Sequence, residues 1–108
     1  MKLEFADDVF SVPGRIIRAP WKLQDLCQIG ERIVALAKFE DLRPPSLGLA
    51  CYSIEGDLLW EAKTWEQYEE HVYAAIREEP SLKANSMGGW LCSIDIESGR
   101  ITERVFTK

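Results

Sequence analysis

Two segments of the chain repeat one β-hairpin pattern: GLACYSIEGDLLWE at residues 48–61 and GWLCSIDIESGRITER at residues 89–104. In each segment an apolar run follows a glycine, reaches an acidic turn with a second glycine, and resumes as an alternating strand. Glu55-Gly56 and Glu97-Ser98-Gly99 are turn residues, because glycine adopts the positive φ that tight hairpin turns need. The repeated pattern predicts antiparallel β-sheet.

The hairpins also carry a family resemblance. Residues 93–101, SIDIESGRI, resemble the inner strand, turn and next strand of a quinoprotein-type propeller blade, and residues 52–60 look like a variant of that unit. The turn glycines lie 43 positions apart, within the range of blade lengths. A propeller needs about four to eight blades, and a chain of 108 residues holds at most about two. A closed propeller from one chain is therefore excluded, and no quinone or dehydrogenase function follows.

The segment RIVALAKF at residues 32–39 is almost continuously apolar. Such a run is typical of a central strand covered on both faces, and Gly30-Glu31 before it can reverse the chain. A short buried helix is the alternative for this run. Residues 15–18 and 23–29 predict two further strands.

A change of period predicts one helix over about residues 65–78. Its apolar stripe recurs at three- and four-residue spacing, as on one face of a helix: Trp65, Tyr68, Val72, Ala75 and Ile76. Thr64 and Gln67 can form a capping box, and Pro80 forbids continuation. The expected fold is therefore a single α+β domain over residues 1–108: an antiparallel meander of about six to seven strands with this amphipathic helix packed on the sheet. The alternative is a mostly-β sandwich or half-barrel.

Charge and cysteine content limit the function classes. The formal net charge is −5, which disfavours nucleic acid and anionic membrane surfaces, whose binding depends on Lys and Arg. The start lacks the apolar core of a secretory signal, and no apolar run is long enough to span a membrane. Three cysteines in strand patterns predict reduced, buried thiols of a cytoplasmic protein. No spacing suggests a metal site or a cofactor.

Catalytic residues are not predicted. His71 is the only histidine, and no Ser-His-Asp or Cys-His arrangement surrounds it. The glutamates of the expected helix are typical of its solvated face. An enzyme is therefore less expected than a binding protein; a pocket between helix and sheet that uses His71, Tyr68 and Glu70 is the alternative.

Candidate binding residues lie in the expected loops, which run over residues 42–47 and 82–87. Trp21 is expected to be the exposed tryptophan because it stands beside Pro20 and Lys22, and it would join the loop residues Arg43, Lys83 and Met87 in one contact surface. The alternative surface is the acidic helix face with Glu69, Glu70 and Glu78.

The leading functional hypothesis is a non-catalytic protein-binding module with another protein, of basic charge, as its partner. In size and charge the chain resembles the immunity proteins that neutralise bacterial toxins by covering a basic site with an acidic face. A self-associating structural module, a homo-oligomer paired through strand edges, is a further alternative.

Overall fold

The computed structural model describes residues 3–38, 40, 46–63, 73–77, 81–86 and 89–106. These residues form β-strands and no α-helix. The strands are β1 Phe5–Ala6, β2 Val9–Val12, β3 Arg15–Arg18, β4 Leu23–Ile29, β5 Arg32–Ala37, β6 Ser46–Ser53, β7 Leu58–Lys63, β8 Tyr73–Arg77, β9 Lys83–Ser86, β10 Trp90–Ile94 and β11 Ile101–Phe106. No helix in these ranges is long and apolar enough to cross a membrane.

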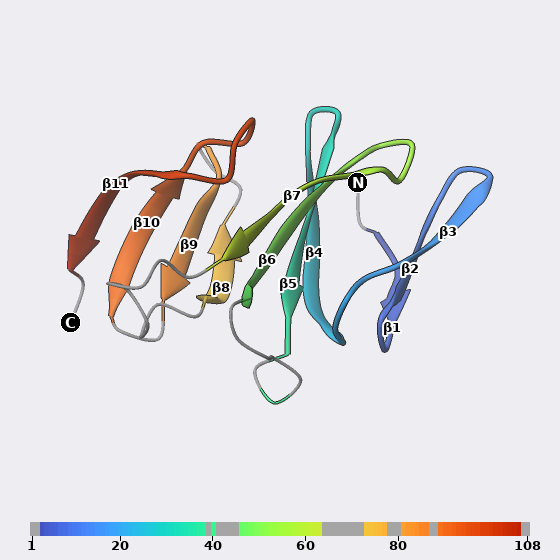
Figure 1. Ribbon diagram of the computed structural model, residues 1–108, viewed down its shortest axis with the longest axis horizontal. Helices are drawn as coiled ribbons and strands as arrows, with labels where there is room; N and C mark the ends of the chain where they lie inside the picture. The colour runs from blue at the N-terminus through green and yellow to red at the C-terminus, as the bar shows by residue number, and fades with distance from the viewer. Residues whose placement is uncertain are drawn as a thin grey trace.

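The described strands build three antiparallel sheets, each a meander in which neighbours along the chain pair with each other. The N-terminal sheet has the order β1-β2-β3, the central sheet β4-β5-β6-β7, and the C-terminal sheet β11-β10-β9-β8. The central sheet lies between the other two (Figure 1). The first sheet has three described strands and the others have four.

Strand β5 shows why the central sheet is covered on both sides. Successive side chains of a strand point to opposite faces. Ile33 and Ala35 accordingly belong to the core shared with the N-terminal sheet, whereas Val34 and Leu36 belong to the core shared with the C-terminal sheet. All four are at most 2% exposed. The prediction of a central strand with two covered faces is confirmed.

Both predicted hairpins are present, as β6–β7 and β10–β11. Their turn glycines have positive φ, 96° at Gly56 and 79° at Gly99. Trp60 of the first hairpin contacts the turn of the second. Its indole Nε1 donates a hydrogen bond of 2.8 Å to the carbonyl of Ile96, and its ring packs over Gly99. The two repeated sequence segments therefore both form β-hairpins, as predicted.

The predicted α+β fold is wrong. Residues 73–77, assigned to the C-terminal end of the expected helix, form strand β8. Its pairing with β9 shifts register between Tyr73 and Ala75, so that Tyr73 and Ile76 both face the core although they are three positions apart. A β-bulge places residues at odd spacing on one face, and this spacing imitates the helical period. Residues 64–72 and 78 lie outside the described residues.

Candidate binding site at the open edge of the N-terminal sheet

The described strands of the N-terminal sheet cover only part of one face of the central sheet. At one side β1 lies beside β4, where the Leu23 amide donates to the carbonyl of Asp7. At the other side β3 lies over the β6–β7 hairpin, where Arg15 Nη1 is 3.0 Å from the carbonyl oxygen of Glu55 and 3.3 Å from Asp57 Oδ1. The described N-terminal sheet ends there, so no fourth strand from these residues lies over β7.

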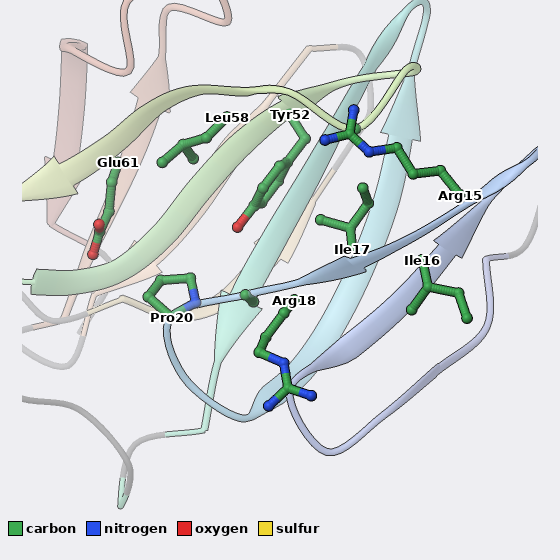
Figure 2. A pocket seen from close by; sticks show the side chains of 10 residues that line it. Arg15, Ile16, Ile17, Arg18, Pro20, Tyr52, Leu58 and Glu61 are labelled. Atoms are coloured by element: carbon green, nitrogen blue, oxygen red, sulfur yellow. The ribbon is translucent and has the colours of Figure 1, made fainter.

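A cavity of about 510 Å³ lies between β3 and the β6–β7 hairpin, open to solvent (Figure 2). One wall is formed by β3 and the turn that follows it, and the other by β6, the hairpin turn and β7. The lining residues are Arg15, Ile16, Ile17, Arg18, Ala19, Pro20, Tyr52, Gly56, Leu58 and Glu61. Its volume is in the range of clefts that hold ligands.

The backbone of β3 is available for pairing on this side. The Ala19 amide donates to the carbonyl of Asp8 at 2.7 Å, and backbone groups in a strand point alternately to its two sides. Arg15 and Ile17 therefore direct their amides and carbonyls toward β2, whereas Ile16 and Arg18 direct theirs toward the open edge. Among the described strands, none pairs with this edge.

Tyr52 places a buried hydroxyl in the cavity. The residue is 3% exposed, and its ring packs edge-on against Phe10 with centroids 5.1 Å apart. In Figure 2 the hydroxyl points toward the Pro20 side of the cavity. Within the described residues this hydroxyl has no hydrogen-bond partner. Burial, and secondarily the nearby charge of Glu61, raises the pKa of Tyr52 to about 12, so that the hydroxyl is neutral at pH 7.

The charged side chains that line the cavity differ in whether a described residue of opposite charge lies beside them. Arg15 pairs with Asp57, and Arg18 Nη1 lies 3.7 Å from Asp8 Oδ2. Glu61 Oε2 accepts a hydrogen bond of 3.4 Å from the Trp21 indole Nε1, but Glu61 forms no ion pair with a basic side chain of the described ranges. The lining therefore contains one carboxylate that lacks a counter-ion among these residues.

The predicted contact surface is not assembled by the described residues. Trp21 is 3% exposed and belongs to the core, so the expectation that it is exposed is wrong. It is buried because the turn after β3 folds it between the N-terminal and central sheets. Lys83 is half-buried in β9, opposite Ser93, and does not lie in a loop. The other predicted binding residues lie outside the described residues: Arg43, Met87, Glu69, Glu70 and Glu78.

Sequence reasoning missed the residues that line the cavity. Tyr52 and Glu61 lie in the first repeated hairpin and look like ordinary strand residues. The one available signal was Glu61 itself, a carboxylate that follows the apolar run Leu58-Leu59-Trp60. The cavity depends on how β3 lies over the β6–β7 hairpin, and a local pattern does not show that arrangement.

Metal-ligand chemistry is not visible in this part of the chain. No group of three or more His, Cys, Asp or Glu side chains in the described ranges could hold a metal ion. The side chains of Cys51 and Cys92 are buried in the other core, as predicted for these two residues, and both are free thiols in the structure. Burial raises the pKa of both thiols, to about 11 for Cys51.

Over the described residues the structure thus defines a β-protein of three stacked antiparallel sheets, with a cavity beside a strand edge that no described strand pairs with. The chain belongs to a family described as a domain of unknown function (DUF7957), whose pattern matches residues 1–106. A comparison with curated proteins found no match to the chain.

Proposed function

We propose that this protein is a cytoplasmic, non-catalytic protein-binding module that takes up an extended segment of another protein along the open edge of β3. The observation that carries the proposal is the β3 edge of the N-terminal sheet, with which none of the described strands pairs. Ile16 and Arg18 offer outward-facing backbone groups, and a cavity lies beside them. An extended peptide that adds to a sheet edge gains main-chain hydrogen bonds, and its alternate side chains enter neighbouring pockets.

The chemistry of the lining favours binding over catalysis. A tyrosine acts as a general base only when it is ionised, and Tyr52, with a pKa raised to about 12, remains a neutral hydroxyl near pH 7. Such a hydroxyl can donate one hydrogen bond and accept others. Together with apolar Leu58 and Pro20, it supports recognition of a side chain.

The substitution Ile16→Pro tests the proposal. Proline removes the amide hydrogen that points to the open edge and leaves the ladder to β2 intact, and edge strands tolerate proline at such positions. Ile16 is 74% exposed, so its side chain contributes little to the core. Ile16→Ala is the matched control because it removes the side chain but keeps the amide.

The assay is affinity purification from extract of the native cell followed by mass spectrometry. Proteins retained by the wild type and by Ile16→Ala are expected to be lost with Ile16→Pro, at unchanged melting temperature. Equal recovery with all three proteins would place the interface elsewhere. Recovery of no protein above the bare matrix would contradict a protein-binding function.

A further inference from the structure

No described strand pairs with the open edge of β3, and the surroundings of this edge determine which groups an added strand would meet. Side chains of a strand alternate between the two faces of its sheet. In a fourth strand on the N-terminal sheet, every second side chain would point toward the central sheet. There it would meet Leu58 and Glu61 of β7 and the hydroxyl of Tyr52, which line the cavity. The cavity would therefore receive one such side chain.

Two groups in this pocket lack a complement among the described residues. Glu61 has the Trp21 indole as a hydrogen-bond donor but no positive charge beside it. The Tyr52 hydroxyl belongs to a side chain that is 3% exposed and lines the cavity (Figure 2), and no described residue forms a hydrogen bond with it. A cationic donor would pair with the carboxylate of Glu61 and could also donate a hydrogen bond to the hydroxyl oxygen of Tyr52, so the two groups together favour a basic occupant.

Arg15 and Arg18 also line the cavity, but these two basic residues do not remove the preference for a positively charged occupant. Arg15 is matched by Asp57, and Arg18 by Asp8. A cation that enters beside Glu61 thus adds to a lining whose arginines are already compensated. The net charge of −5 on the whole chain also attracts basic segments over longer distances.

We infer that the occupant of the open edge is a basic extended segment of a partner protein, which pairs with β3 and places an Arg or Lys side chain in the cavity against Glu61 and Tyr52. This inference rests on the proposed function. A guanidinium fits the pocket well, because its planar set of donors can reach a carboxylate and a hydroxyl oxygen at the same time. The aliphatic stem would pack on Leu58 and Pro20.

A library of short random linear peptides displayed on phage is the probe. Selection on the wild-type protein is expected to enrich sequences with one Arg or Lys at a fixed position among β-forming residues. A synthetic peptide of the enriched sequence is then titrated by calorimetry against the wild type and the variants. The substitution Glu61→Gln retains an oxygen for the Trp21 indole but removes the charge, so the fold is expected to persist. Glu103→Gln on β11 is the matched control, because it removes an exposed carboxylate in the C-terminal sheet.

The expected result is a Kd at least about tenfold higher for Glu61→Gln, no measurable binding for Ile16→Pro, and an unchanged Kd for Glu103→Gln. Tyr52→Phe is expected to weaken binding several-fold while the melting temperature stays the same or rises. The indole N–H resonance of Trp21, identified by Trp21→Phe, should shift on addition of the peptide because this group is bonded to Glu61.

The outcomes separate the two proposals. Enriched peptides without a basic residue, or equal affinity for the wild type and Glu61→Gln, would overturn the inference and leave a protein-binding function standing. Enrichment of no sequence on the wild type above Ile16→Pro would overturn the open edge as a binding site. A wild-type dimer that becomes monomeric with Ile16→Pro would show that a second copy of the chain fills the edge, which also overturns the inference.

Discussion

The two faces of the central sheet differ in how completely they are covered. On one face, residues of β8, β9 and β10 in the C-terminal sheet pack around Leu49 and Cys51, both 0% exposed. On the other face, three described strands of the N-terminal sheet cover β4 to β6 and leave a cavity over β7. Cys51 and Tyr52 are neighbours in β6 but belong to different cores. These two adjacent residues have different environments because their side chains point to opposite faces of the central sheet, and a different sheet packs on each face.

Because the two faces differ in coverage, we expect them to differ in what they contribute to the protein. The closed face buries apolar side chains at close packing and provides stability. The open face leaves polar groups of Tyr52 and Glu61 at a cavity, where they contribute less to stability and are available to a ligand. Substitutions that are chemically matched should thus have large effects on the closed face and small effects on the open one.

The largest contrast is expected from two leucine substitutions. Leu49→Ala on the closed face should lower the free energy of unfolding by about 2–5 kcal/mol, because it leaves a cavity in a packed core. Leu58 lines the open cavity and is 53% exposed. The substitution Leu58→Ala should therefore lower the free energy of unfolding by no more than about 1 kcal/mol. Urea denaturation measures both. Equal losses would show that the open face is packed as tightly as the closed one.

A second contrast concerns the two hairpin glycines. Both have positive φ, so alanine should cost about 1–2 kcal/mol at either position. At Gly99 an added Cβ would also press into the Trp60 ring, which is held by its hydrogen bond to Ile96. At Gly56 the added Cβ would meet the flexible end of Ile17, next to the open cavity.

Gly99→Ala is therefore expected to cost about 1–3 kcal/mol more than Gly56→Ala, owing to overpacking against a fixed ring. Thermal and chemical unfolding would measure the difference. Gly30→Ala is the control, because its φ of 58° is positive and no atom lies within 4 Å of the added Cβ. If Gly99→Ala resembled this control, the Trp60 contact would not constrain the second hairpin.

The smallest effect is expected from pH and concerns the closed face. Burial raises the pKa of Cys51 from 9.0 to about 11, so folding favours the neutral thiol. The resulting stability is present below pH 9 and is lost as the pH rises through 11, where the folded protein also ionises. The free energy of unfolding should fall over this window, and Cys51→Ala should reduce the slope.

Thiol labelling provides an independent measurement of the same feature. At pH 8 a thiol reagent should modify half-buried Cys27 before Cys51 and Cys92, which are 0% and 1% exposed. Buried thiols react only when the structure opens. Rapid labelling of Cys51 or Cys92 in the native protein would show that the closed face is not closed in solution.

Local patterns in the sequence predicted the parts of the fold that depend on near neighbours. The two hairpins, their turn glycines and the two-faced strand β5 follow from glycine conformation and from the alternation of side chains along a strand. The helix over residues 65–78 was predicted from the same kind of pattern and was wrong for residues 73–77. There a bulge in β8, which forms against β9, changes which residues share a face.

The sequence by itself determined that this chain makes antiparallel hairpins with apolar faces on both sides of one strand. Only the tertiary structure decided how many strands each sheet contains and where the N-terminal sheet ends over β7. The burial of Trp21 and the meeting of Tyr52, Glu61 and the β3 edge at one cavity depend on contacts between distant segments. Such contacts form because stacked sheets bury apolar area together, and no local period in the chain records which sheet lies against which.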